Sequence, residues 1–232
     1  MSVFVPVIIL VLAMLIQGSM QLSQGIFSIF YHSTLAKFSH KKTDDLSLSF
    51  LLGVEFFFAI IFMSIYAAVN FLFLNLVDYS IVFWIFAGIA FAIAICLFCF
   101  YFRKTIATAL FIPRRVAASF VTHATHVRTR RDAFALGFFS NLPELIFTLP
   151  LIIIVCFLLT TFPSPASCFI IIPYIIIAVI PLFVIRTLFS TRHNLAFVTR
   201  LRARLKPVIR TILSLSFITI AALLIYLGVI YG

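Results

Sequence analysis

Six long apolar segments restrict this chain more than any other feature of its sequence. A helix needs about 20 mostly apolar residues to cross the hydrocarbon core of a bilayer, which is about 30 Å thick. Every backbone N–H and C=O group there needs a partner within the protein, which favours helices for segments of this length. We therefore expect an all-α, polytopic membrane protein with about six transmembrane helices, at residues 3–31, 47–72, 80–102, 133–160, 168–189 and 210–231.

The composition favours a lipid environment over water. Of the 232 residues, 64% are hydrophobic and 10% are charged, whereas soluble domains average about 45–50% apolar and about 25% charged residues. The chain contains 30 phenylalanines, whose side chains insert favourably among acyl chains. We expect one membrane domain over residues 1–232, with the first apolar segment retained as a span.

The basic residues predict an orientation. Of the 17 lysines and arginines, three lie between the first two spans, seven between spans three and four, and seven around the link between spans five and six. The other two links contain none, and cytoplasmic loops are the ones that carry excess Lys and Arg. We expect a cell (plasma) membrane protein with both termini outside and the three basic links in the cytoplasm. Five or seven spans would place a basic cluster on the wrong face.

The net charge of +11 raises the question of partners. No compact basic domain or RNA-binding motif accompanies this charge, so we expect no nucleic-acid partner. Residues 103–132 alternate apolar and basic positions, which predicts an interfacial helix held by anionic lipid headgroups. The expected partners are the lipid bilayer, its anionic lipids and a small solute, and association into a homo-oligomer stays open.

Two segments 120 positions apart resemble each other and predict a repeat. Residues 21–28 read QLSQGIFS and residues 141–148 read NLPELIFT, with three identities and four related pairs. Each segment falls in the first span of a three-span half. Because three is odd, a duplicated half enters the membrane inverted, as in many secondary transporters. We expect two inverted three-helix repeats, 1–102 and 133–232, joined by the basic link 103–132.

Three residues in or just before the repeat segments are expected to interrupt helices, namely Gly18, Gly25 and Pro143. Non-helical backbone at membrane depth is tolerated where protein buries it or where it lines a watery cavity. Close helix packing through Gly and Ser is the alternative. Because amides are larger and more polar than packing requires, we expect a path for substrate or ion lined by Gln21, Ser23, Gln24, Asn141 and Pro143.

Two carboxylates fall within the predicted spans. Glu55 and Glu144 are both flanked by apolar residues, and an ionisable group inside a membrane is a functional candidate because its burial is costly. We expect Glu144 to carry a coupling proton and Glu55 to be a second titrating group. A protonated carboxyl bonded to a neighbouring helix is the alternative for each. His32 could exchange protons at the cytoplasmic mouth.

No cofactor, metal site or catalytic motif is expected. Cys96 and Cys99 form a C-x-x-C spacing inside an apolar run, where small apolar filler is the preferred interpretation. His123 and His126 have the i, i+3 spacing of two metal ligands, but no nearby cluster completes a shell. No catalytic triad, phosphate loop or zinc-protease motif is present, so we do not expect an enzyme.

The chain resembles the lysine-exporter (LysE-type) superfamily of small transporters in length, in its six-span plan and in the two repeat segments. Members carry a Pro-Gly-Pro-Asn-like break in the first span, where this chain has residues 21–25, followed by Lys37–Lys42 and Gly53. Residues 141–144 resemble the family's Asn-Pro-Lys-like second break. The prolines of the first break are absent, and Glu144 stands where lysine is usual. The resemblance implies ion-coupled export of a small solute, an amino acid or a metal ion.

The sequence therefore predicts a secondary transporter, an ion-coupled exporter. The alternative is a non-transporting membrane component, such as the permease-like subunit of an ATPase-driven complex or an envelope scaffold. In that case residues 103–132 or 190–209 would dock the partner.

Overall fold

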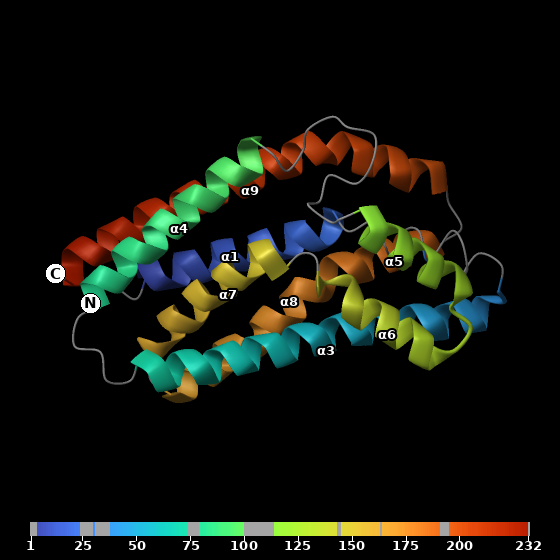
Figure 1. The fold of residues 1–232 in the computed structure, drawn as a ribbon, viewed down its shortest axis with the longest axis horizontal. Helices are drawn as coiled ribbons and strands as arrows, with labels where there is room; N and C mark the ends of the chain where they lie inside the picture. Colours follow the sequence, from blue (N-terminus) through green and yellow to red (C-terminus); the bar gives the residue numbers. More distant parts are fainter. Residues whose placement is uncertain are drawn as a thin grey trace.

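The computed structural model describes residues 4–23, 30, 38–73, 79–99, 114–142, 145–162, 164–190 and 195–231. The regular elements in these ranges are eight α-helices (Figure 1), which confirms the expected all-α class. They are α1 (Phe4–Ser23), α3 (His40–Phe73), α4 (Tyr79–Cys99), α5 (Arg114–His126), α6 (Arg130–Ser140), α7 (Leu145–Thr160), α8 (Ser164–Ser190) and α9 (Leu195–Tyr231).

Four of these helices are long and apolar enough to cross a membrane. Their apolar stretches are Lys41–Leu72 in α3, Tyr79–Cys99 in α4, Phe169–Thr187 in α8 and Thr211–Ile230 in α9. The other two predicted spans correspond to shorter apolar helices within α1 and α7. Many large apolar side chains lie on the outside of the bundle, where lipid would cover them. The described helices indicate a multi-pass helical membrane protein.

The fourth predicted span is divided between two helices. α6 ends at Ser140 and α7 begins at Leu145, with Asn141 and Leu142 outside the α-helices. The side chains of Ser140 and Asn141 both donate to the carbonyl oxygen of Gly137, at 2.7 and 3.0 Å. These bonds satisfy a carbonyl in the last turn of α6, where helices commonly run out of backbone donors.

The sixth helix is longer than predicted. We expect a span from residue 210, whereas α9 begins at Leu195. Its apolar stretch starts only at Thr211, so the basic residues 200–210 form part of a helix rather than a loop. Hydropathy shows where the chain enters the lipid but not where the helix begins, because Leu, Arg and Lys also form helices well in water. Residues 195–209 are therefore helical, and the apolar stretch Thr211–Ile230 agrees with the predicted span 210–231.

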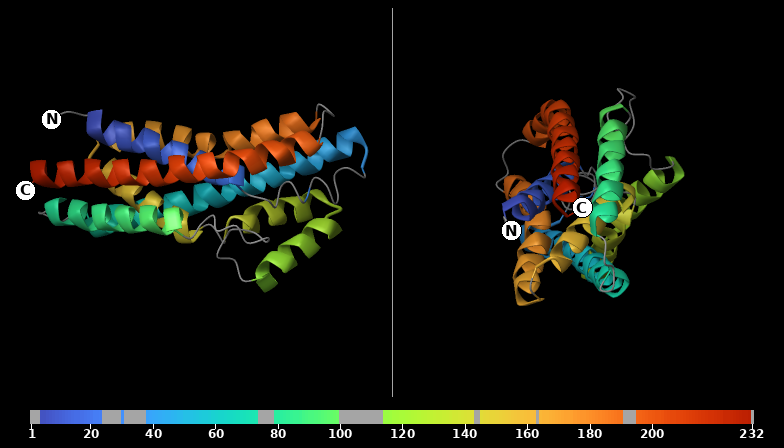
Figure 2. Two further views of the ribbon diagram at one scale, coloured as in Figure 1. Left: turned by 90° about the horizontal axis from the view of Figure 1, so that it is seen from above. Right: turned by 90° about the vertical axis from the view of Figure 1, so that its left-hand side faces the viewer.

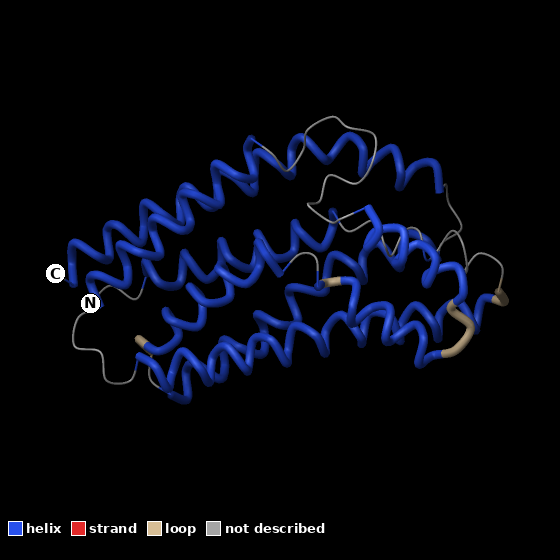
Figure 3. The backbone as a smooth tube through the Cα atoms, viewed as in Figure 1, coloured by secondary structure: helices blue, strands red, loops and turns tan. Residues whose placement is uncertain are grey.

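The helices form an elongated bundle (Figures 1 to 3). α4 lies along α9, and α3 packs against α6, α7 and α8, while α1 packs against α7, α8 and α9. The Ser80 hydroxyl of α4 donates to the Gly228 carbonyl near the end of α9 at 2.8 Å, so these two helices are antiparallel. α1 begins and α9 ends at the same end of the bundle (Figure 1).

Two glycines allow the backbones of α3 and α6 to touch. A Cβ atom on Gly53 would overlap the carbonyl oxygen of Phe134 and lie 2.9 Å from the nitrogen of Phe138. A Cβ on Gly137 would likewise overlap the carbonyl oxygen of Phe50. Small residues bring membrane helices into such contact, which strengthens van der Waals packing. The contact fixes α6, and hence the interruption after it, against α3.

Candidate functional site

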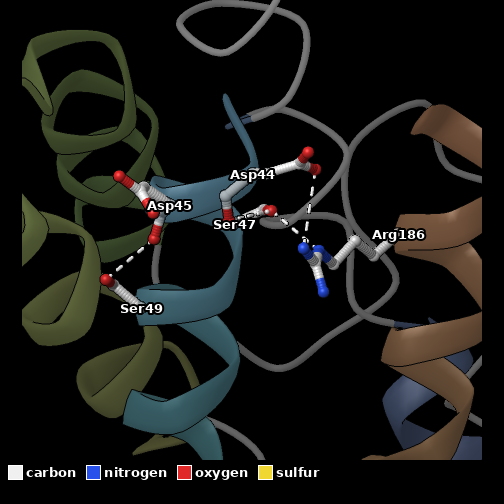
Figure 4. A network of polar contacts seen from close by, with 5 residues as sticks. All are labelled: Asp44, Asp45, Ser47, Ser49 and Arg186. Carbon is white, nitrogen blue, oxygen red and sulfur yellow. Dashed lines mark hydrogen bonds and ion pairs between the residues drawn. The ribbon is translucent and has the colours of Figure 1, made fainter. Parts of the chain in front are cut away.

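A charged network joins three helices at one end of the bundle. Asp44 and Asp45 follow one another in the N-terminal part of α3. Arg186 of α8 places Nη2 3.5 Å from Asp44 Oδ1 and donates through Nε to the Ser47 hydroxyl at 2.9 Å (Figure 4). On the other side, Arg130 of α6 forms an ion pair with Asp45. The start of α3 therefore holds α8 with one carboxylate and α6 with the next.

This network brings residues of all three predicted basic links to the same end of the protein. Asp44 and Asp45 lie at the end of the first link, Arg130 lies near the end of the second, and Arg186 belongs to the basic residues around the third. Sequence reasoning overlooked both aspartates, because acidic residues contribute little to membrane orientation. Two adjacent carboxylates inside an otherwise basic link were the signal that could have identified them.

The interior contains polar atoms without hydrogen-bond partners. Gln17 of α1 is fully buried, and within the described structure neither its Nε2 nor its Oε1 has a partner. The same holds for Tyr174 Oη on α8 and Ser214 Oγ on α9. Burying an amide without a hydrogen bond costs roughly 2–7 kcal/mol, depending on the reference solvent. Such groups are rare in native proteins, and each therefore requires a physical explanation.

The residue after Gln17, Gly18, lies against Pro181, a proline inside α8. A Cβ on Gly18 would be 3.3 Å from Pro181 Cγ and 4.0 Å from the Ile177 carbonyl oxygen. Proline has no N–H group, so Pro181 removes the usual helical partner of the Ile177 carbonyl four residues earlier. The crossing of α1 and α8 therefore places Gly18 against a backbone carbonyl that lacks its helical donor, one residue along the chain from the unpartnered Gln17. A glutamine and a proline within apolar runs were the sequence signals, and sequence reasoning missed both.

Of the residues predicted from the sequence, Asn141 and Glu55 are described most fully. Asn141 is buried, and its side-chain bond to the Gly137 carbonyl is a helix-ending contact. Glu55 is half-buried on α3, and its carboxylate makes no hydrogen bond or ion pair within the described structure. The structure therefore does not join Glu55 to Asn141.

The other predicted path residues stay untested. Gln21 and Ser23 belong to the last turn of α1. Gln24, His32, Pro143 and Glu144 lie outside the described residues.

The described residues show no group of three or more His, Cys, Asp or Glu side chains that could hold a metal ion. Each of the two α5 histidines instead bonds to its own helix: His123 Nδ1 lies 2.7 Å from the Ser119 carbonyl oxygen, and His126 Nδ1 lies 2.8 Å from that of Thr122. The thiols of Cys96 and Cys99 are free and exposed on α4. None of these groups forms a recognisable catalytic or metal centre.

No family model matches the chain, and neither the curated proteins nor the solved structures provide a match.

Proposed function

We propose that the protein is an ion-coupled secondary transporter that exports a small solute, such as an amino acid or a metal ion, in the manner of the lysine exporters. The main support is Gln17, whose amide is fully buried and without a partner in the described structure, and which directly precedes Gly18, the residue that packs against Pro181 of α8. A polar group of this kind inside a membrane bundle is stable when water, an ion or a substrate meets it during part of a cycle. The crossing of α1 and α8 is therefore the proposed substrate path.

The positions of the helices agree with the proposed inverted repeat. Moved back by 120 positions, α6 would occupy residues 10–20, within α1, and α8 would occupy 44–70, within α3. The same shift places α9 over α4. Asp44 contacts Arg186 at one end of α3, and the ring of Phe62, further along α3, lies 5.0 Å from the ring of Tyr174. The corresponding helices α3 and α8 are therefore antiparallel, as an inverted repeat requires.

One pair of contacts also agrees with the proposed repeat. Gly18 of α1 lies against Ile177 of α8. The position 120 residues after Gly18 is Phe138 of α6, and the position 120 residues before Ile177 is Phe57 of α3. The rings of Phe138 and Phe57 lie 5.2 Å apart at an interplanar angle of 88°. The crossing of α1 and α8 thus has a counterpart in the crossing of α6 and α3. Two related crossings offer the two halves that rocking-type transporters move against each other.

In this mechanism Glu144 carries the coupling proton. Glu55, whose carboxylate makes no hydrogen bond or ion pair within the described structure, is the second titrating group. Gln17 joins Gln21, Ser23, Gln24 and Asn141 as residues that contact substrate or support interrupted backbone, and His32 exchanges protons at the basic end. The ion pairs of Asp44 and Asp45 close that end, since opening it separates α3 from α8 or α6.

The experiment is proton-coupled flux in proteoliposomes made with the full-length protein. Vesicles are loaded in turn with single amino acids or divalent metal ions, and a pH-sensitive dye reports proton movement. At least one solute should drive proton flux in the native protein, and Glu144→Gln should abolish it. The matched variant Thr219→Val, on an exposed position of α9, should retain the flux. Undiminished coupling in Glu144→Gln would overturn the assignment of the proton carrier.

An ATPase-driven complex or an envelope scaffold is the second candidate function. It is favoured by α5, a basic helix that packs against α6 and exposes Ser119, Thr122 and His123. Such a helix could dock a soluble subunit. Stoichiometric co-purification of an ATPase, together with absence of flux from the isolated protein, would favour this function over autonomous transport.

A further inference from the structure

A cavity of about 610 Å³ lies between α5 and α6, at the end of the bundle that carries the charged network. Figure 2 shows these two helices set beside the long helices at this end. The volume falls within the range of about 300–1,000 Å³ that is usual for ligand pockets. The cavity is separate from the crossing of α1 and α8, so a ligand could bind in it whether or not the protein transports a solute.

The lining of this cavity is apolar on one side. Val127 and Leu136 are buried there, at 3% and 5% exposure, whereas Phe139 and Leu142 line it while remaining 50% and 45% exposed. Exposed apolar side chains at the mouth of a pocket lose contact with water when an apolar ligand covers them, which favours binding. A ligand that fills this cavity therefore gains from having a hydrocarbon part.

Two histidines line the other side of the cavity with a fixed orientation. Both Nδ1 atoms lie within hydrogen-bond distance of backbone carbonyls of α5, from Ser119 and Thr122. A carbonyl only accepts, so each Nδ1 carries the proton and each Nε2 is left for a ligand. Because His123 and His126 are three residues apart on one helix, their rings lie on the same face. Protonation turns both Nε2 atoms into donors for an anion.

The charges around the cavity are mainly positive. Arg128 and Arg131 are exposed in the turn between α5 and α6 and at the start of α6, and Arg130 beside them is paired with Asp45. The lining carboxylate, Asp132, accepts hydrogen bonds from the backbone nitrogens of Thr129 at 3.1 Å and Arg128 at 3.3 Å. Its charge is thus directed at the first turn of α6, which leaves the two histidines and the arginines to meet a ligand.

We propose that this cavity is a binding site for one anionic phospholipid, with the phosphate at the Nε2 atoms of His123 and His126 and an acyl chain over Val127, Leu136, Phe139 and Leu142. Free phosphate would use the histidines and leave the apolar side uncovered, whereas a phospholipid satisfies both. The position also fits a lipid, because α6 is held against α3, a helix long enough to span the bilayer. Protonation of the two imidazoles strengthens binding, since both Nε2 atoms then donate to the phosphate.

The experiment measures binding of a fluorescent phosphatidylglycerol to the full-length protein in neutral detergent, at pH 6 and pH 8. Phosphatidylcholine with the same chains and inorganic phosphate are the competing probes. The variant His123→Gln/His126→Gln should bind phosphatidylglycerol roughly tenfold more weakly at pH 6 and lose the pH dependence. The variant Leu142→Ser should weaken binding at both pH values by reducing the apolar contact.

The charge-matched control is Lys41→Gln/Lys42→Gln, which removes two exposed cations from the start of α3, outside the cavity. Its affinity should stay within about twofold of the native protein. Equal losses in the two double variants would show general electrostatic attraction and overturn the proposal. Full displacement of the lipid by millimolar phosphate, or equal affinity for phosphatidylcholine, would overturn it as well.

Discussion

The carboxylate of Asp44 on α3 lies 3.5 Å from the guanidinium of Arg186 on α8, and the same guanidinium donates to Ser47 at 2.9 Å. The side chains of the pair are 22% and 37% exposed for Arg186 and Asp44, whereas those of Arg130 and Asp45 are 70% and 40% exposed. Screening by water weakens exposed ion pairs. The contact with Arg186 is therefore the stronger connection at this end of the bundle.

A double-mutant cycle tests this difference. We expect Asp44→Asn and Arg186→Gln to couple by about 0.5–1 kcal/mol in thermal unfolding of the detergent-purified protein. Asp45→Asn and Arg130→Gln should couple by less, because Arg130 is mostly in water. A coupling at Asp45–Arg130 equal to or larger than that at Asp44–Arg186 would contradict this ranking.

The backbone contact between α3 and α6 leads to a prediction about its two glycines, Gly53 and Gly137. Gly53→Ala and Gly137→Ala each place a methyl group inside a backbone carbonyl of the other helix, so the helices have to separate. We expect each variant to lose about 1–3 kcal/mol of stability, measured as a lower unfolding temperature.

Gly88→Ala is the matched control for this experiment. Gly88 lies within α4, and a Cβ there would meet no atom within 4 Å. Replacing a helical glycine by alanine without a clash stabilises by up to about 1 kcal/mol. An unfolding temperature for Gly53→Ala as high as that of Gly88→Ala would show that the two backbones are further apart than the structure indicates.

The sequence predicts an all-α membrane protein because a run of about 20 apolar residues is long enough to cross the hydrocarbon core and has to be helical there. The predicted span at 80–102 begins within one residue of α4, because Asp78 directly before Tyr79 makes the change in polarity abrupt there. The predicted span at 210–231 agrees with the apolar stretch Thr211–Ile230, whereas the earlier start of α9 at Leu195 is not predicted, since a helix that continues into water leaves no change in hydropathy at its end.

The candidate site is predicted less well than the fold. The interruption predicted at Pro143 agrees with the end of α6 at Ser140 and the start of α7 at Leu145, whereas Gly18, also predicted to interrupt a helix, lies inside the continuous helix α1. Gln17 is missed because its significance depends on which helix faces it. The partners of Asp44 and Asp45 are 142 and 85 residues away in the chain, and no local pattern specifies such pairings.

The start of α6 leads to a prediction about pH. Asp132 and Thr129 form a reciprocal capping box, in which the Asp132 nitrogen bonds to the Thr129 hydroxyl at 3.2 Å and the carboxylate accepts from the Thr129 nitrogen. Hydrogen bonds from Thr129 and Arg128 lower the pKa of Asp132 below its usual 3.8. A carboxylate with a lowered folded-state pKa contributes stability above its unfolded pKa and loses it as the pH falls through the folded value.

We therefore expect protection of the α6 amides from hydrogen exchange to decrease below about pH 4, once the intrinsic acid dependence of exchange is subtracted. Asp132→Asn should remove this dependence, and Thr129→Ala should cost about 1 kcal/mol at neutral pH, as helix caps typically do. Because Asp132 is exposed, the pH-dependent part should be the smaller one. An unchanged decrease below pH 4 in Asp132→Asn would assign it to another group.

The unpartnered amide of Gln17 leads to a prediction in which stability and transport change in opposite directions. Gln17→Leu keeps a similar volume and removes two buried polar atoms that have no partner in the described structure. Relieving such a group should raise stability by about 1–3 kcal/mol. If Gln17 serves a substrate path, the same variant should lose most of its solute-driven proton flux, since stabilising changes at functional positions commonly reduce activity. A variant that is more stable and fully active would show that Gln17 lies off the path, and a variant that is less stable would show that its amide has partners in the membrane.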